Sequence, residues 1–518
     1  MSTVAPAARA AHGGAWGPRL VRWWPLALLT LLAAVLRLST LHLQSFWYDE
    51  AFTVVRDLHP SLGATLRSMV HTENTPPLWY LITWADSRVL GTGEVALRLP
   101  SAVCGIATVP VAWAIAHELS GRRAATLCAA MVAANPLFVW YSQEARAYGL
   151  FMLTAALAML CFVRAAREPT PARMALFALT GALALLSQYF AVFLLVPMVL
   201  WLMCSRRSRR AALPAVAALA LVGLALIPLV LAQGGHGTQW IGQWPLIGRV
   251  EAIPQYYLSG YSGAPLGHGV ELLVALPILA GLAFGVWRMW EPPAAARRRG
   301  TDALDAQGSL AQERRGLLMA ALIALAGVLI PLAMALAGAD YLAPRNLLAA
   351  MIPVTVAIAL VVASPSTGRA GMVLGALVVL AALAISVDVD LSPRLRRGNW
   401  RAVARALGPV GPLRAITTVE LGETPLQYYL RGLRNLPART RVLVSEIDET
   451  GYPPLRRSAR EPPAPGFRLT ARLDIDGLIV YRFVSSVPRF VSEASLRRGV
   501  ITPARPEVLV PARARLSA

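Results

Sequence analysis

Long apolar runs separated by short polar stretches dominate this sequence. Runs such as PLALLTLLAAVL, LLVALPILAGLAFGVW and GMVLGALVVLAALAISV approach the roughly 20 residues that one helix needs to cross a bilayer. Lipid offers the backbone no hydrogen-bond partners, so these runs are expected to be helices. The pattern predicts a mostly α, polytopic transmembrane helical bundle over 1–388. Eleven spans are predicted, near 23–43, 95–117, 124–141, 148–164, 174–188, 190–204, 212–232, 269–290, 316–338, 346–363 and 370–388.

The arginines predict the orientation of these spans. The segment 76–91, PPLWYLITWADSRVLG, is short and contains Asp86 and Arg88. If it does not cross, the loops richest in arginine all lie on one side, as cytoplasmic loops do: 122–123, 164–173, 206–210, 297–315 and 369. We therefore predict a multi-pass cell-membrane protein with a cytoplasmic N-terminus. Its first external loop, 44–94, would carry one or two interfacial helices.

The pattern changes after residue 388. Apolar spans stop, and RAITTVEL, RVLVSEI and GLIVYRFVS read as strands beside an amphipathic helix, RGNWRAVARAL. This predicts a small soluble α/β domain over 389–485. The segment 486–518, rich in proline and arginine, is expected to be a poorly ordered tail. An odd number of spans from a cytoplasmic N-terminus makes the C-terminal domain extracytoplasmic.

Composition narrows the function classes. The net charge is +21, and all 49 basic residues are arginines; because they lie between apolar spans, they predict membrane orientation and not a nucleic-acid partner. The four cysteines lie in or beside apolar spans at no metal-ligand spacing, so neither a disulfide framework nor a zinc site is indicated. The sequence also contains no P-loop, dinucleotide fingerprint, GxSxG or HExxH.

The strongest candidate for chemistry is FWYDEAFT, residues 46–53, shortly after the first span. Asp49 and Glu50 are adjacent acids between aromatic residues, where the membrane meets the external water. A carboxylate there can accept a proton from a substrate hydroxyl, and an apolar neighbourhood tunes its pKa. The alternative is an acidic pair that merely ends a helix.

A second candidate is the short external turn SQEARAYGL, residues 142–150. Charged groups at membrane depth usually face a protein interior or a wet cavity. Glu144 is a candidate second acid, and Arg146 a candidate holder of an anionic group with its fork of donors. The alternative is a Glu144–Arg146 surface pair.

Further candidates lie in two external segments and one span. In HTENTPPLWY, His71 and Glu73 precede a rigid Pro-Pro. His71 is a candidate metal ligand, but a lone histidine in a loop is more often solvated. In ADYLAPRNLL, Tyr341 and Arg345 lie at the outer mouth of two spans, with Arg345 a candidate phosphate partner or a snorkelling arginine. Arg37, inside the first apolar run, either contacts a buried anion or snorkels to the outer interface, and snorkelling is the favoured prediction.

These motifs together resemble the GT-C superfamily of integral-membrane glycosyltransferases, in the branch of the protein O-mannosyltransferases and lipid A aminoarabinose transferases. The resemblance is strongest over residues 30–165. It rests on the Asp-Glu pair, the Pro-Pro segment, RLPSAV at 98–103, GRR at 121–123 and SQEARAYGL, and it recurs at YLAPRNLLAAMIP and RGNWRAVARAL. Structurally known relatives have somewhat more than eleven spans, so the resemblance implies eleven to thirteen.

The resemblance implies a sugar donor on a polyprenyl phosphate in the outer leaflet and an acceptor hydroxyl that attacks with inversion. Asp49 would be the general base, and Glu50 would support it or bind a metal or the acceptor. Glu144 matches a second acidic residue of some relatives, and Arg345 or Arg146 would stabilise the phosphate leaving group. His71, Glu73 and Tyr341 remain candidates for binding donor or acceptor.

Several questions stay open at this point. No cofactor is certain, but Asp49, Glu50 and Glu144 would be the ligands of a divalent metal if one is used. The acceptor would be an envelope glycan, lipid or protein; the loops 233–268 and 291–315 are too short for the β-rich insertion of protein O-mannosyltransferases, which argues against a protein. The alternatives are a transporter or flippase for lipid-linked saccharides, which would show internal repeats, and a polysaccharide polymerase or ligase.

Overall fold

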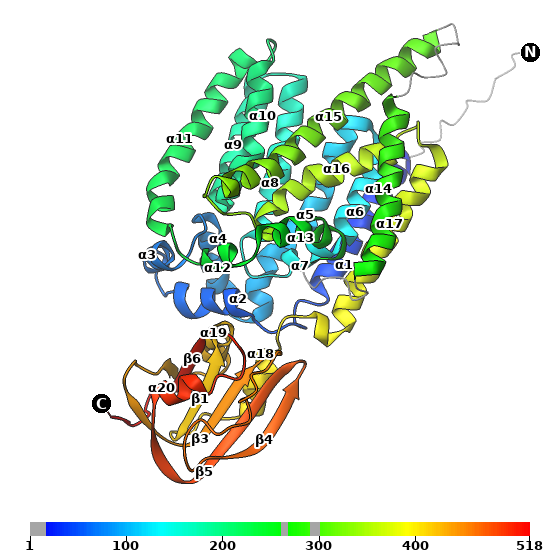
Figure 1. Cartoon of the computed structure of the whole chain (residues 1–518). Helices are drawn as coiled ribbons and strands as arrows, with labels where there is room; N and C mark the ends of the chain where they lie inside the picture. The colour runs from blue at the N-terminus through cyan, green and yellow to red at the C-terminus, as the bar shows by residue number, and fades with distance from the viewer. Residues whose placement is uncertain (1–16, 261–267, 291–300, 518) are drawn as a thin grey trace, which may run out of the picture.

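The computed structural model describes residues 17–260, 268–290 and 301–517. It consists of a bundle of helices with a smaller sheet-containing domain against one end (Figure 1). Short helices lie between these two parts. The arginines expected at 297–299 lie outside the described residues.

The bundle contains a helix at each of the eleven predicted spans. These helices are α1 (Gly17–Leu38), α5 (Glu94–Ser120), α6 (Arg122–Ala134) with α7 (Pro136–Ser142), α8 (Tyr148–Arg167), α9 (Pro171–Ser187), α10 (Val192–Cys204), α11 (Arg209–Gln233), α14 (His268–Trp290), α15 (Thr301–Leu336), α16 (Met351–Val362) and α17 (Gly368–Leu391). Within the described residues, six helices are long and apolar enough to cross a membrane, or seven if the bent pair α6–α7 is one span. Several other helices are apolar but shorter. The chain is therefore a multi-pass membrane protein of mostly helical fold.

The bend between α6 and α7 follows from two adjacent residues. Pro136 has no backbone N–H to donate, and the Asn135 side chain accepts hydrogen bonds from the N–H groups of Leu137 and Phe138. Asn135 thus caps α7 as a new helix, and the two axes differ by 56°. The bend directs the chain into the turn 143–147.

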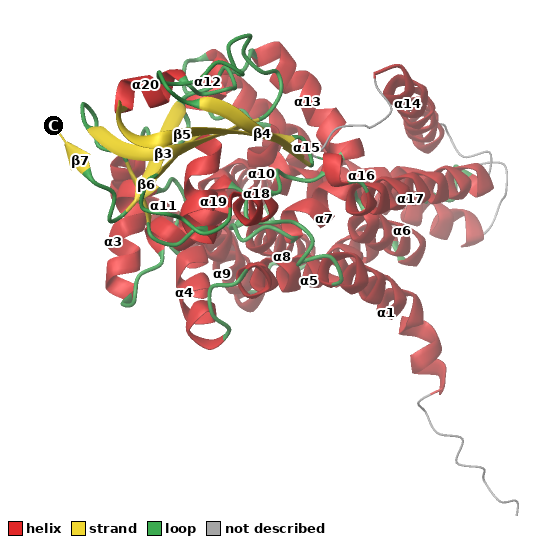
Figure 2. Cartoon of the chain, turned by 90° about the horizontal axis from the view of Figure 1, so that it is seen from below, coloured by secondary structure: helices red, strands yellow, loops and turns green. Residues whose placement is uncertain are grey.

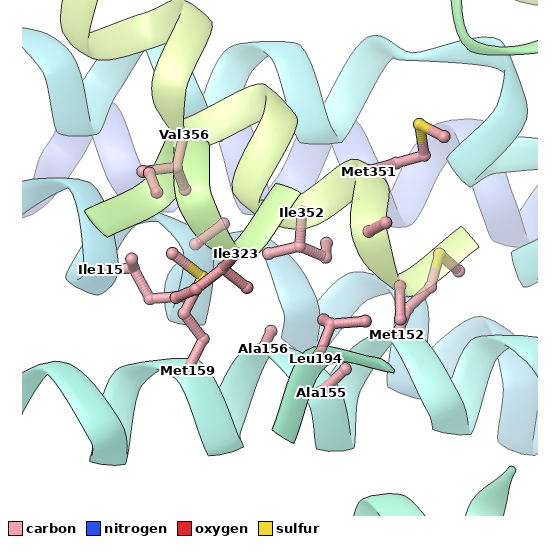
Figure 3. Close-up of a cluster of buried hydrophobic side chains, with 14 of the residues drawn as sticks. Ile115, Met152, Ala155, Ala156, Met159, Leu194, Ile323, Met351, Ile352 and Val356 are labelled. Carbon is pink, nitrogen blue, oxygen red and sulfur yellow. The ribbon is translucent and has the colours of Figure 1, made fainter. Parts of the chain in front are cut away.

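Side chains of the central helices form one continuous apolar core. Ile115 of α5, Met159 of α8, Leu194 of α10, Ile323 of α15 and Val356 of α16 meet there (Figure 3). Outward side chains of α11 and α17 are instead largely exposed apolar residues, as lipid-facing positions should be. The core fixes the ends of α1, α5, α7 and α8 that lie nearest to α2.

Arg37 does not snorkel, contrary to the prediction. Its guanidinium is buried and donates to the carbonyls of Val132 and Ala133 and to Ser142 Oγ. These carbonyls are at the end of α6, where Pro136 removes a helical donor, so they accept from arginine instead. A Cβ on Gly105 would lie 2.0 Å from Ser142 Oγ and 3.1 Å from Arg37 Nε, so only glycine fits there.

The segment predicted as the first external loop forms short helices at one end of the bundle: α2 (Tyr48–Phe52), the π-helix η1 (Thr53–Asp57), α3 (Leu62–Thr72) and α4 (Leu78–Val89). At 12 residues, α4 is about 18 Å long, shorter than the hydrocarbon core of a bilayer. Among the described residues it is not one of the helices that are long and apolar enough to cross a membrane, so the placement of 76–91 along the outer interface stays a prediction. The remaining short elements are η2 (Tyr189–Ala191), α12 (Gln239–Gln243), α13 (Leu246–Ser259), η4 (Pro344–Ala350) and η5 (Pro393–Leu395).

The C-terminal domain is a mixed sheet with helices against it (Figure 2). Its elements are α18 (Trp400–Leu407), β1 (Arg414–Val419), α19 (Glu420–Tyr429), β2 (Leu433–Asn435), β3 (Arg441–Gly451), β4 (Arg468–Ile475), β5 (Leu478–Ser492), α20 (Glu493–Arg498), β6 (Pro506–Pro511) and β7 (Leu516–Ser517). The order is β2-β6-β1-β3-β5-β4, with β7 also on β3; β1 and β3 are parallel and the other pairs antiparallel. Each face of the sheet covers its own apolar core.

The prediction of a poorly ordered tail from 486 is wrong. Strand β5 continues to Ser492, and β6 lies between β1 and β2, with Val508, Leu509 and Val510 fully buried. The short apolar run EVLV is flanked by proline and arginine, so it resembles a loop in sequence. Its pairing with β1 supplies the burial that the local sequence does not suggest.

Candidate active site

The site begins at α2, where Asp49 and Glu50 are consecutive residues of a helix. Adjacent side chains in a helix point about 100° apart, so the two acids cannot share one environment. Glu50 is fully buried, whereas the Asp49 side chain is 21% exposed. One acid of the pair therefore belongs to the interior and the other to an accessible surface.

Glu50 is held by Arg98, one turn into α5. Arg98 Nε and Nη2 donate to the two Glu50 carboxylate oxygens at 2.7 and 2.6 Å, and the Ala145 N–H donates to Oε1 at 2.8 Å. Arg98 also donates to the carbonyls of Leu41, Gln44 and Ser45. Burial by itself would raise the pKa of Glu50, but Arg98 holds it below its usual range. Glu50 is thus an ionised anchor that ties α2 to α5 and to the turn at Ala145.

Glu144 is bound by an arginine from the linker between α17 and α18. Arg397 Nη2 lies 2.6 Å from Glu144 Oε2, and Arg397 Nη1 lies 3.8 Å from Glu50 Oε2. The guanidinium lies 4.7 and 4.5 Å from the ring centroids of Trp47 and Trp140. Burial raises the pKa of Glu144; Arg397 opposes this, and the charges of Glu50 and Asp49 add to it.

Asp49 is joined to Arg345 at the start of η4. Arg345 Nη1 lies 3.2 Å from Asp49 Oδ2, with the two side chains 23% and 21% exposed. The Arg345 guanidinium stacks at 4.6 Å on the Trp240 ring of α12. A monodentate, partly exposed pair of this kind leaves donors on the arginine and an oxygen of the carboxylate available to a ligand.

Arg146 is neutralised by Glu73 and not by Glu144. It donates to both Glu73 oxygens at 2.6 and 2.7 Å and to Thr53 Oγ1 at 3.1 Å. The predicted alternative of a Glu144–Arg146 pair does not form. Asp57 lies fully buried beside this pair, and burial together with the charge of Glu73 raises its pKa to about 8.

Two predicted residues take a more peripheral place. His71 is exposed at the end of α3 and has no hydrogen-bond partner among the described residues. Tyr341 is 39% exposed and packs against Phe190. Its loop is held by Arg249 of α13, which binds Asp340 at 2.6 Å and the Leu342 carbonyl at 2.9 Å.

The sequence leaves a divalent metal open, with Asp49, Glu50 and Glu144 as its ligands if one is used. Within the part of the chain that the structure describes, no three histidine, cysteine or acidic side chains converge as metal ligands. Glu50 and Glu144 both accept hydrogen bonds from arginine instead. With two of these three carboxylates bonded to arginine, the residues present do not fit a metal ion.

The structure adds two residues that the sequence reasoning missed, Arg98 and Arg397. Both fall within motifs that carry the family resemblance, RLPSAV and RGNW. Each arginine is the first residue of its motif, so the motifs themselves pointed to both positions. Their pairing with Glu50 and Glu144 spans 48 and 253 residues, which no local pattern reveals.

Comparisons with known proteins agree with the resemblance. Residues 74–231 match the protein family described as dolichyl-phosphate-mannose-protein mannosyltransferase. This match includes Arg98, Glu144 and Arg146 and confirms the resemblance inferred from the sequence. A search of curated proteins gave no match.

Several solved structures are similar to the chain. They include an oligosaccharyltransferase of Archaeoglobus fulgidus tethered with an acceptor peptide (14% identity, TM-score 0.47, 81% of this chain and 60% of that one). Others are ArnT of Cupriavidus metallidurans bound to undecaprenyl phosphate (16%, 0.40, 91% and 98%) and the S. cerevisiae Pmt1–Pmt2 protein O-mannosyltransferase complex bound to the sugar donor (18%, 0.33, 42% and 35%). The chain thus spans 60% of the length of the archaeal protein.

Proposed function

We propose that this protein is a membrane glycosyltransferase that moves a hexosyl or pentosyl group from a polyprenyl-phosphate donor to a cell-envelope acceptor on the outer face of the membrane. The reaction inverts the anomeric centre, and Asp49 is the general base. The observation that carries the proposal is the accessible Asp49–Arg345 pair, 3.2 Å apart. The neighbouring acids Glu50, Glu73 and Glu144 are all committed to buried arginines.

The pair supplies the two charges that the reaction needs. The acceptor oxygen forms a bond to the anomeric carbon while the bond from that carbon to the phosphate oxygen breaks. Asp49 takes the proton of the acceptor hydroxyl. Arg345 donates to the phosphate oxygens as negative charge moves onto the leaving group, and its fixed fork of N–H donors suits that geometry.

The neighbouring ion pairs support these roles for Asp49 and Arg345. Arg98 neutralises Glu50 and Arg397 neutralises Glu144, each in a buried ion pair. Asp49 differs from both acids because its ion pair with Arg345 is partly exposed. Arg146 is already satisfied by Glu73, so Arg345 is the better phosphate partner of the two predicted candidates. The family match, to a group described as mannosyltransferases using a dolichyl-phosphate sugar, supports a lipid-phosphate donor.

The first test is donor consumption by the reconstituted protein. Polyprenyl-phosphate forms of mannose, glucose, arabinose and aminoarabinose are supplied with envelope extract, and mass spectrometry follows loss of sugar from the lipid. Asp49→Asn should slow transfer about 10²–10⁴-fold, the usual contribution of a general base. Glu251→Gln, an exposed acid on α13, is the matched control and should transfer at the wild-type rate.

Two results would contradict the proposal. A folded Asp49→Asn protein that transfers sugar as fast as wild type rules out Asp49 as the base. A wild-type protein that consumes none of the donors but moves lipid-linked saccharide across the vesicle membrane would be a flippase. Lengthening of a lipid-linked glycan without consumption of a single-sugar donor would indicate a polymerase.

A further inference from the structure

The linker between α17 and α18 enters the candidate active site. Arg397 is an arginine of this linker with a side chain only 8% exposed. It reaches the fully buried Glu144 at 2.6 Å and lies flanked by the indole rings of Trp47 and Trp140. Its charge is therefore held in one place by two aromatic faces and a buried carboxylate.

The same linker is attached to the loop that contains Asp49 and Glu50. The Arg397 N–H donates to Gln44 Oε1 at 3.1 Å, Ser45 Oγ donates to the Gly398 carbonyl at 3.0 Å, and the Trp400 N–H donates to Ser45 Oγ at 3.0 Å. These bonds tie the linker at Arg397 to the segment directly before α2.

The body of the C-terminal domain docks on the same loop. Tyr429 Oη accepts from the Phe46 N–H at 2.7 Å and donates to Glu94, and Arg401 binds Glu94 and the carbonyl of Leu43. In Figure 1, α18 and α19 lie directly against the end of the bundle where α2 is found. Docking of the domain is thus coupled, through backbone and side-chain bonds, to the position of Arg397.

We propose that Arg397 is a positioning residue of the transfer reaction, which holds Glu144 and Glu50 in their working geometry when the C-terminal domain is docked on the first external loop. The inference rests on the proposed function, since it concerns the same site. It assigns the soluble domain a role in assembling the active site, in addition to any contact with the acceptor.

The charges around Glu144 explain why Arg397 is needed. Glu144 faces Arg397 from the linker, Glu50 and Asp49 from α2, and Arg345 from η4. Arg345 is paired with Asp49, and Glu50 with Arg98. Without Arg397, burial and the two neighbouring acids would favour the protonated form of Glu144. A neutral Glu144 no longer repels Asp49 or orients the turn 143–147.

The experiment compares R397Q, R397K, E144Q and the double variant R397Q/E144Q with wild type in the sugar-transfer assay. The matched control is R394Q, which removes one exposed arginine from the same linker. R397Q should lower kcat about 100-fold, the scale expected when a catalytic group is displaced by about 1 Å, while KM for the donor changes little. E144Q should show a similar loss, and the double variant should lose no more than either single variant.

The pH profile separates positioning from general damage. In R397Q the acid limb of kcat/KM should move to higher pH, because Glu144 then protonates more readily. R397K keeps the charge, so its acid limb should stay near that of wild type even though its kcat falls. R394Q should match wild type in both rate and profile.

Three outcomes overturn the inference: R397Q behaves like R394Q, its loss adds in full to that of E144Q, or its pH profile is unshifted. If R397Q does not purify as a folded protein, R397K in the E144Q background provides the same test. Once Glu144 is replaced, R397K should cause no further loss of activity. Failure of the wild-type protein to transfer sugar from any donor would instead contradict the proposed function.

Discussion

Replacing Glu50 with glutamine should reduce stability more than it changes the chemical step. Glu50 is fully buried and receives two charged bonds from Arg98, at 2.6 and 2.7 Å. The substitution leaves the guanidinium buried and still bonded to three backbone carbonyls, but without a counter-charge. Breaking a buried pair by removing one partner costs about 3–5 kcal/mol. Glutamine keeps a carbonyl acceptor for Arg98 or the Ala145 N–H, so the lower end, about 3 kcal/mol, is expected.

Thermal unfolding in detergent measures this loss. At roughly 2 °C per kcal/mol for a large domain, Glu50→Gln should lower the unfolding temperature by about 6 °C. The heating rate must be the same for every variant because unfolding of large proteins is often irreversible. Glu168→Gln is the control, since the Glu168–Arg173 pair is solvent-exposed, with side chains 63% and 35% exposed, and such pairs contribute about 1 kcal/mol at most.

Sugar transfer measured well below the unfolding temperature completes the comparison. We expect Glu50→Gln to retain much more activity than Asp49→Asn, which should keep its unfolding temperature. A Glu50→Gln protein with the wild-type unfolding temperature and no transfer activity would refute this reasoning. Glu50 would then act in the chemistry, and the structural assignment of the Glu50–Arg98 pair would be wrong.

Three further predictions follow from other parts of the structure. Arg345→Gln should lower kcat about 10²–10³-fold, as removal of one oxyanion donor does, measured by donor consumption; unchanged kcat would exclude Arg345 from phosphate stabilisation. Asp57 has a pKa raised from 3.8 to about 8, so the folded state binds a proton that the unfolded state releases between these values, and stability falls as pH rises through this window. Asp57→Asn should remove this loss of stability. At pH 9 it should be more stable than wild type by at most about 6 kcal/mol, at ~1.4 kcal/mol per pKa unit. Parallel plots of unfolding free energy against pH for the two proteins would contradict this. A chain ending at residue 485 lacks β6 and the end of β5, so its soluble domain should be digested rapidly in limited proteolysis, whereas a resistant domain of wild-type size would show that β6 is dispensable.

The candidate site shows how far local patterns reach. Asp49, Glu144 and Arg345 were found from sequence because charged residues at membrane depth are unusual and need a reason. The sequence did not show that Arg146 pairs with Glu73, because both fall in loops whose meeting depends on the packing of α3 against η1 and the turn. It also placed Arg37 at the interface, although the end of α6 provides buried carbonyls for it.

Much of the architecture can be predicted from the residues alone: apolar runs of bilayer length, arginine-rich loops, and strands and a helix after residue 388. These features are local, since hydrophobic periodicity and the need to satisfy the backbone in lipid act on contiguous residues. The accessible acid, the arginine partner of each carboxylate and the place of β6 in the sheet become clear only from the packed chain. Those outcomes depend on ion pairs and strand pairings between distant segments, such as Arg397 with Glu144 across 253 residues. Burial makes each such pair costly to leave unpaired, so the packed structure, and not the local pattern, assigns the partners.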